Sequence, residues 1–216
     1  MAEPSDIWNS LSEPWRIAFE QAWIAFGEGN FGIGACIADD AGEIRAVGRN
    51  QVATPRPGPL PLAGNYLAHA EMNALASLDE FSARGFTMYT TLEPCLMCAA
   101  ASLFMNIERV EYATRDEFFE PFDEVLWPHH PYTRTRAPES VQAITGKLSS
   151  FARVLPLVFT FHERPRGVAD VATQRRPALS ELARSGEMVQ LRADAAEGLG
   201  LFAALDRIWG RLPTAG

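Results

Sequence analysis

Apolar residues recur every three to four positions between residues 12 and 28, which predicts an amphipathic helix near the start of the chain. Its apolar side carries Trp15, Phe19, Ala22, Trp23 and Phe26. Ser12 is a suitable N-cap, and Pro14 is tolerated in the first turn because an N–H there has no helical partner. A helix with one apolar face is expected to cover a sheet or another helix.

The elements predicted next are strands and helices. Two short apolar runs at residues 32–38 and 43–48 flank the turn-forming sequence D-D-A-G, so together they predict a β-hairpin. The elements expected after it are a Pro- and Gly-rich loop at 53–64, a helix at 67–84, a strand at 86–91, a helix from 94 to about 106 and a strand at 109–114. This order predicts a layered α/β sandwich around a mixed sheet whose last strands run parallel.

The pattern is weaker after residue 119. Residues 120–140 combine prolines and aromatic residues, which predicts an ordered but irregular cover. The remaining expected elements are a strand at 154–161, an exposed Arg- and Pro-rich segment at 164–177, and helices at 178–185 and 197–211. We therefore expect a core domain at residues 1–120 and a C-terminal extension at 121–216 that adds a strand and helices and packs on the core.

Composition and charge narrow the range of functions. The 216 residues are 47% hydrophobic and 21% charged, as in globular proteins. No apolar run approaches the roughly 18–20 residues of a membrane span, and residues 1–30 lack signal-peptide features, so we expect a cytoplasmic protein with no membrane partner. The net charge of −8 is uneven, because residues 1–122 carry −10 and the rest carries +2. An acidic first half repels a phosphate backbone and makes nucleic acid a less favoured partner.

Three residues of the predicted core have the chemistry of a metal site. His69 lies at the start of one predicted helix, and Cys95 and Cys98 lie in the first turn of the next, where the helix dipole stabilises thiolates. Three protein ligands with an open fourth position are typical of a catalytic zinc site that holds water. A CxxC pair is also found in redox sites and structural zinc sites, but no second cysteine pair or CxxH segment is present to complete a four-ligand site.

Glu71 is the candidate for a proton shuttle beside this metal site. In the middle of a helix, residues two positions apart point about 200° away from each other, so His69 and Glu71 can converge only near the start of a helix. The third cysteine, Cys36, lies in a predicted strand and is expected to be a small buried hydrophobic residue.

The segments around these residues resemble the zinc-dependent cytidine deaminase superfamily, and most of all its branch of guanine deaminases and tRNA adenosine deaminases. The similar segments are H-A-E-M-N-A-L at 69–75, T-L-E-P-C-L-M-C-A-A-A at 91–101, G-R-N at 48–50 and A-T-R-D at 113–116. The resemblance covers roughly residues 15–116 and implies a three-layer α/β/α sandwich around a five-stranded mixed sheet. It also implies a homodimer.

The resemblance implies a role for each matching residue. His69, Cys95 and Cys98 would hold Zn²⁺, and Glu71 would move the protons of a hydrolytic deamination. The residues expected to bind the substrate are Asn50, Ala70, Asp116 and Phe118. Asn50 could instead only cap a turn, and Asp116 could cap a helix. Further candidates for the pocket wall, or for the core, are Phe119, Phe122 and Trp127.

The function implied by the resemblance is the release of ammonia from a free nucleobase or nucleoside, such as guanine or a related aminated heterocycle. The acidic first half favours a small neutral substrate over tRNA. Three alternatives stay open: a tRNA adenosine deaminase, a cytosine or cytidine deaminase, and a non-catalytic binding module on the same fold. The presence of Glu71 counts against the last of these.

Overall fold

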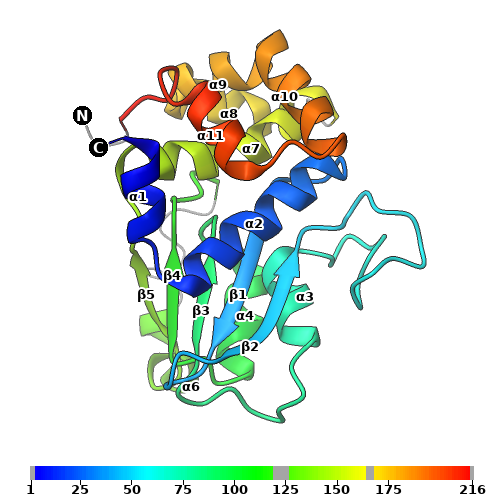
Figure 1. Ribbon diagram of the computed structural model, residues 1–216. Coiled ribbons are helices and arrows are strands. Elements are labelled where there is room, and N and C mark those ends of the chain that lie inside the picture. Colours follow the sequence, from blue (N-terminus) through cyan, green and yellow to red (C-terminus); the bar gives the residue numbers. More distant parts are fainter. Residues whose placement is uncertain (1–2, 119–126, 164–167, 215–216) are drawn as a thin grey trace.

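The computed structural model describes residues 3–118, 127–163 and 168–214, and a five-stranded sheet lies at its centre (Figure 1). The strands are β1 (Gly34–Ala38), β2 (Ile44–Arg49), β3 (Thr87–Thr90), β4 (Arg109–Tyr112) and β5 (Glu139–Gln142). Their order across the sheet is β2-β1-β3-β4-β5. β1 is antiparallel to β2 and β3, whereas β4 is parallel to β3 and β5. The predicted hairpin and the parallel last strands are thereby confirmed.

Helices cover both faces of this sheet, which confirms the predicted three-layer sandwich. The helix α2 (Glu13–Gly27) packs on one face, and α3 (Ala70–Ala76) and α4 (Leu96–Phe104) pack on the other. In β1, Cys36 belongs to the apolar cluster on the α2 side, whereas Ala35 belongs to the cluster on the α3 side. Because successive strand residues point to opposite faces, a strand covered on both sides is buried at every position, as β1 is.

The helices of the C-terminal part of the chain gather at one end of the sheet (Figure 1). They are α7 (Gly146–His162), α8 (Val168–Arg175), α9 (Pro177–Arg184), α10 (Gly186–Ala196) and α11 (Leu201–Ile208). The longest of them, α7, packs against α2, α8 and α9, and every residue from 148 to 160 is buried. The core therefore continues from the sheet into this group of helices.

The strand expected at 154–161 is wrong. These residues form the second half of α7, and the fifth strand of the sheet is β5 at 139–142. Pro156 lies inside α7, where proline is disfavoured because it lacks an N–H and clashes with the preceding turn. A helix enclosed on nearly all sides also has no polar face, so its sequence shows no helical period.

Other predicted boundaries differ less from the structure. The helix expected at 67–84 is limited to the seven residues of α3. α8 forms within the segment expected to be exposed, and its Ala172 is fully buried. Further short elements are α1 (Pro4–Ser10), α6 (Pro131–Arg134) and the 3-10 helix η1 (Trp127–His129). Within the described ranges, the helices are all too short or too polar to cross a bilayer.

Candidate active site

His69, Cys95 and Cys98 converge at the N-terminal ends of α3 and α4. His69 Nδ1, Cys95 Sγ and Cys98 Sγ form a triangle whose three sides are each 3.6 Å. A tetrahedral Zn²⁺ with bonds of about 2.0–2.1 Å to nitrogen and about 2.3 Å to sulfur separates such ligands by roughly 3.6–3.8 Å. The donor set therefore fits zinc, and its three ligands leave a fourth position for water.

The helix boundaries explain how these side chains meet. His69 is the N-cap of α3 and Cys95 is the N-cap of α4, and both have extended backbone conformations. Cys98 lies one turn into α4, on the same side as Cys95. Two residues that are two positions apart within a helix point about 200° away from each other. His69 precedes α3, so this rule does not separate it from Glu71. His69 and Glu71 consequently line the same cavity.

Glu71 is 4% exposed and interacts with His69 and Cys98. The hydroxyl group of Thr90 lies 3.2 Å from Glu71 Oε1 and 3.1 Å from the carbonyl oxygen of Leu92, and it can donate to either. Burial raises the pKa of the Glu71 carboxyl group, although the charge of His69 opposes this effect. A carboxyl group with a raised pKa is suited to accept a proton and pass it on.

A hydrogen bond between the thiols of Cys95 and Cys98 shifts their pKa values in opposite directions. This bond lowers the pKa of the Cys95 thiol to about 4, and the hydrogen bond with His69 acts in the same direction. The same bond, together with burial, raises the pKa of Cys98. Burial lowers the pKa of His69, but the hydrogen bond with Cys95 and the charge of Glu71 outweigh it, so the pKa is raised. A thiolate next to an imidazole is a donor set that suits zinc.

Two of the three candidate metal ligands, His69 and Cys95, line a cavity of about 250 Å³ together with Glu71. This volume lies near the lower end of the range of about 300–1,000 Å³ that is usual for small-molecule sites. Apolar side chains form much of the wall, among them Phe31, Ile33, Val52, Leu92 and Phe118. Buried polar side chains at the cavity include Asn50, Glu93 and Asp116. An apolar cavity with a few convergent polar groups is typical of a site for a small heterocycle.

Asn50, Asp116 and Phe118, which were expected to bind the substrate, all line this cavity. Asn50 is 1% exposed, and its Oδ1 accepts a hydrogen bond of 3.3 Å from the backbone of Val52, so it also caps the turn after β2. The backbone N–H of Asp116 donates to Glu93 Oε2 at 3.0 Å, and Asp116 Oδ1 accepts from the backbone of Phe118 at 3.1 Å. These bonds fix the position of Asp116 at the wall.

Ala70 lies elsewhere: it is fully buried in the apolar cluster on the α3 side and does not line the cavity. Its role in substrate binding stays a prediction. Trp127 borders a separate, smaller cavity next to Pro94 and Pro138. Phe119 and Phe122 lie outside the described residues.

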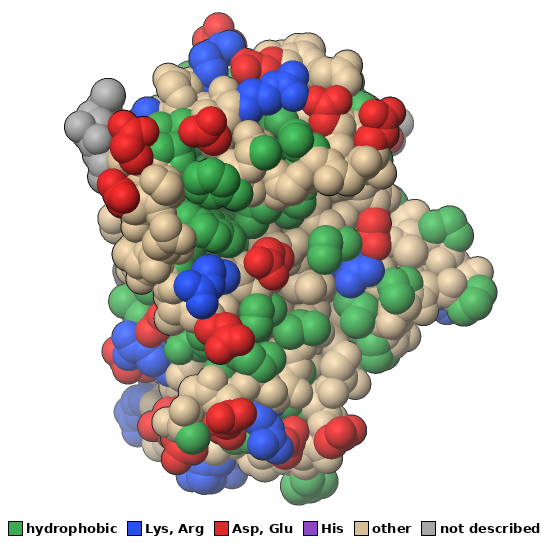
Figure 2. Space-filling model, viewed as in Figure 1, with side chains coloured by type: hydrophobic (Ala, Val, Ile, Leu, Met, Phe, Trp, Pro, Cys, Tyr) green, Lys and Arg blue, Asp and Glu red, His purple; other side chains and the backbone are tan. Residues whose placement is uncertain are grey.

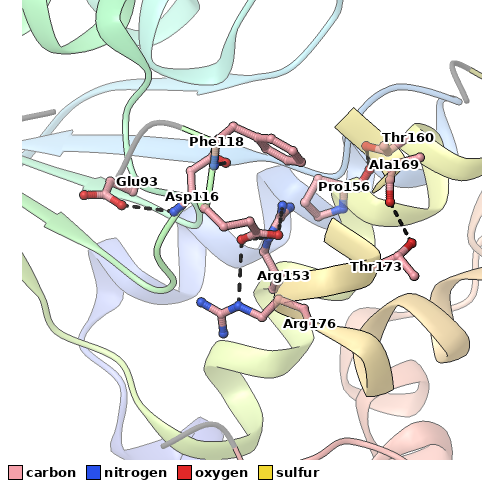
Figure 3. Close-up of polar contacts among 10 residues, drawn as sticks. Glu93, Asp116, Phe118, Arg153, Pro156, Thr160, Ala169, Thr173 and Arg176 are labelled. Carbon is pink, nitrogen blue, oxygen red and sulfur yellow. Dashed lines mark hydrogen bonds and ion pairs between the residues drawn. The ribbon is translucent and has the colours of Figure 1, made fainter. Parts of the chain in front are cut away.

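Sequence reasoning missed one wall of the cavity, which α7 supplies. Arg153, Pro156 and Thr160 line the cavity from this helix (Figure 3). Their spacing of three and four residues places them on one helical face, but the prediction of a strand at 154–161 hid this signal. Phe159 of α7 also packs against Phe31, with ring centroids 4.1 Å apart.

Comparison with known proteins gives matches to the same region. Residues 9–114 match the family described as the cytidine and deoxycytidylate deaminase zinc-binding region. The tRNA-specific adenosine deaminase 2 of Xenopus laevis is 30% identical over 128 residues, which are 57% of this chain and 71% of that protein. The tRNA-specific adenosine deaminase of Aquifex aeolicus is 30% identical over 133 residues, covering 54% of this chain and 82% of that protein. The cytosine deaminase of Candida albicans is 31% identical over 98 residues, covering 44% and 60%.

The matched region contains His69, Cys95 and Cys98, whose triangle fits zinc, and also Glu71 beside them. Sequence similarity and donor geometry thus agree on one kind of chemistry. This chain belongs to the cytidine and deoxycytidylate deaminase family and is a zinc-dependent hydrolytic deaminase.

Proposed function

We propose that this deaminase acts on a free nucleobase or nucleoside, and that a purine such as guanine is its best substrate. The observation that carries this proposal is the convergence of buried acceptors in a cavity of about 250 Å³. Glu71 and Asp116 present carboxyl groups there, and Asn50 adds an amide. A heterocycle rich in N–H groups complements such a wall, and guanine carries N–H donors on both of its rings.

In this proposal, Glu71 moves the protons of the reaction. His69, Cys95 and Cys98 would hold Zn²⁺, which would supply Lewis-acid activation of a water molecule. Glu71 accepts a proton from the attacking water and delivers it to a ring nitrogen of the substrate. The water oxygen forms a bond to the carbon that carries the amino group. Glu71 then takes the second proton from the newly bound hydroxyl group and passes it to the amino group. The C–N bond breaks, ammonia leaves, and the C–O bond becomes the carbonyl of the oxo product.

The charges around the cavity support a neutral substrate. Arg153 is the sole lysine or arginine among the described residues that line it, and its guanidinium group is already paired with Glu117. A phosphate group would therefore meet carboxyl groups without a free cation to bind it. On the face of the molecule shown in Figure 2, acidic and basic side chains are interspersed, in contrast to the continuous basic surface that a polynucleotide favours.

A tRNA adenosine deaminase is the second candidate, because the relatives from Xenopus laevis and Aquifex aeolicus carry that name. Tyr66 lines the cavity and is 71% exposed, so an aromatic ring is available at the cavity for stacking on a nucleotide. Stacking of this kind tolerates many bases and does not itself select RNA.

Ammonia release tests these candidates. The zinc-loaded protein is assayed with guanine, guanosine, adenine, adenosine, cytosine, cytidine, deoxycytidine monophosphate and an anticodon-loop RNA, and Glu71→Gln serves as the inactive control. We expect turnover of a free base or nucleoside, with guanine fastest. Turnover of the RNA alone would overturn the proposal in favour of the second candidate. Full zinc content without ammonia release from any compound would indicate a binding module.

We also propose a homodimer that uses the exposed face of α4. Leu96 and Phe104 of this helix are 49% and 68% exposed, and the ring of Phe104 lies 6.0 Å from that of Tyr132. Large apolar side chains that are exposed together are typical of interaction surfaces. A second copy of the chain is the proposed occupant, because a twofold contact would cover the same face on both subunits.

A further inference from the structure

A buried ion pair connects the C-terminal helices to the cavity. Arg153 of α7 donates three hydrogen bonds to the carboxylate of Glu117: from Nε at 3.0 and 3.2 Å, and from Nη2 at 2.6 Å. The side chains are 3% and 2% exposed. Burying two charges costs desolvation energy that their attraction only partly returns. Such a pair is thus weak evidence for stability, and its geometry suggests a role in fixing the neighbouring chain.

Glu117 directly follows Asp116, and the two side chains have different surroundings. Asp116 lines the cavity, whereas Glu117 is held by Arg153. On the other side, the backbone N–H of Asp116 donates to Glu93 Oε2, and Glu93 lies two residues before the metal ligand Cys95. The segment around Asp116 is therefore fastened at two points, one beside the metal site and one on α7.

Arg153 also contacts the cavity and its aromatic wall. Its guanidinium carbon lies 5.8 Å from the centre of the Phe118 ring, and both residues line the cavity. The charge of Arg153 lowers the pKa of Asp116, in opposition to burial, which has the larger effect and raises it. Without Arg153, two adjacent buried carboxyl groups would lose their nearest positive charge.

We propose that Arg153 is a positioning residue for substrate recognition: through Glu117 it holds the segment 116–118 so that the Asp116 carboxylate accepts a hydrogen bond from a ring N–H of the heterocycle. This inference rests on the proposed function, and it makes α7 a determinant of which heterocycle binds. A planar guanidinium group that donates to both carboxylate oxygens fixes orientation as well as charge.

Arg176 offers a matched control. Its Nε lies 3.8 Å from Glu117 Oε2, its side chain is 26% exposed, and it does not line the cavity. Both arginines contribute positive charge near Glu117, but Arg153 alone of the two also reaches the cavity. Replacing each arginine in turn therefore distinguishes two effects of Arg153: its positioning of residues 116–118, and the positive charge that both arginines place near Glu117.

The experiment compares Arg153→Met, Arg153→Lys, Arg176→Met and Asp116→Asn in the zinc-loaded protein. For each variant, kcat and KM are measured with guanine, and 1-methyl-, 7-methyl- and 9-methylguanine are tested as substrates or competitive inhibitors. Zinc content and thermal unfolding are recorded in parallel. The wild-type protein is expected to reject at least one methyl derivative, because a methyl group removes the N–H that Asp116 accepts.

We expect Arg153→Met to raise KM at least tenfold with zinc content unchanged, and to lose the same methyl discrimination that Asp116→Asn loses. Arg176→Met should change KM less than twofold, and Arg153→Lys should fall between the two. Unchanged KM and unchanged methyl discrimination in Arg153→Met would overturn the proposal, as would an equal effect of Arg176→Met. If Arg153→Met does not fold, Arg153→Lys and Glu117→Gln decide: wild-type discrimination in both would overturn it.

Failure of the proposed function is distinguishable from failure of this inference. If another base is turned over instead of guanine, the same variants are compared on that base and its N-methyl derivatives. If RNA alone is turned over, the proposed function fails, and an unchanged KM for that RNA in Arg153→Met would show that the positioning role fails as well.

Discussion

Gly48 of β2 packs directly against the first residue of α3, where a Cβ atom at position 48 would overlap the carbonyl oxygen of Ala70. The same Cβ would also overlap the backbone nitrogen of Ala74. The close approach of strand and helix therefore requires glycine at this position. It matters for the site because α3 carries Glu71 and is capped by His69.

We expect Gly48→Ala to push α3 away from the sheet and to displace both site residues. Overpacking of this kind costs about 1–3 kcal/mol of folding free energy. Chemical denaturation, zinc content and kcat are the measurements, and all three should fall. Gly186→Ala is the matched control, because a Cβ at Gly186 meets open space. An active, fully metallated Gly48→Ala protein would contradict the importance of this contact.

Glu71→Gln should retain zinc but lose turnover by a factor of at least ~100, because the amide cannot accept the proton of water. Metal content and ammonia release measure the two effects separately. Glu20→Gln is a suitable control, since Glu20 is exposed on α2 and does not line the cavity. Turnover close to that of the wild type in Glu71→Gln would refute its role as the proton shuttle.

In the metal-free protein, the cysteines should react with an alkylating agent in a defined order. Burial raises the pKa of Cys36 to about 12, so at pH 8 its thiol keeps its proton and stays unreactive in the folded protein. Cys95 has a pKa of about 4 in the metal-free protein and is thus a thiolate at this pH. We expect iodoacetamide to label Cys95 first after chelation, and Cys36 only after unfolding. Mass spectrometry of the adducts gives the order, and early labelling of Cys36 would contradict it.

Phe104→Glu should convert the proposed homodimer into monomers, because it places a charge on the exposed apolar face of α4, at the C-terminal end of the helix. Light scattering after size-exclusion chromatography measures the mass. Phe81→Glu is the control, since Phe81 is fully exposed and lies outside α4, in the loop between α3 and β3. If Phe104→Glu and Phe81→Glu both have the mass of the wild-type protein, this face of α4 is not the interface.

The zinc-binding triad was predictable because its signal is local. His69, Cys95 and Cys98 each lie at the start of a helix, and helix starts leave readable patterns of sequence. Asn50 was expected at the site through the resemblance of G-R-N at 48–50, and it lines the cavity, whereas its role in binding stays a prediction. The division of the chain into a core at 1–120 and an extension at 121–216 stays a prediction.

The α7 wall was not predictable from its own sequence. Glu117 and Arg153 are 36 residues apart, and nothing in either segment indicates that they meet. The hydrophobic period and the composition of a segment predict its local structure. The contact between Glu117 and Arg153 depends instead on how α7 packs against α2 and α9. The uniform burial of α7 removed the helical pattern that would have placed Arg153 and Thr160 on one face.

The late position of α7 in the chain has a consequence for biosynthesis. Translation completes the metal ligands at Cys98, whereas α7 ends at His162, and at roughly 5–20 residues per second the ribosome needs several seconds to make the intervening segment. The residues that form the candidate metal site are therefore synthesised several seconds before one side of the substrate cavity.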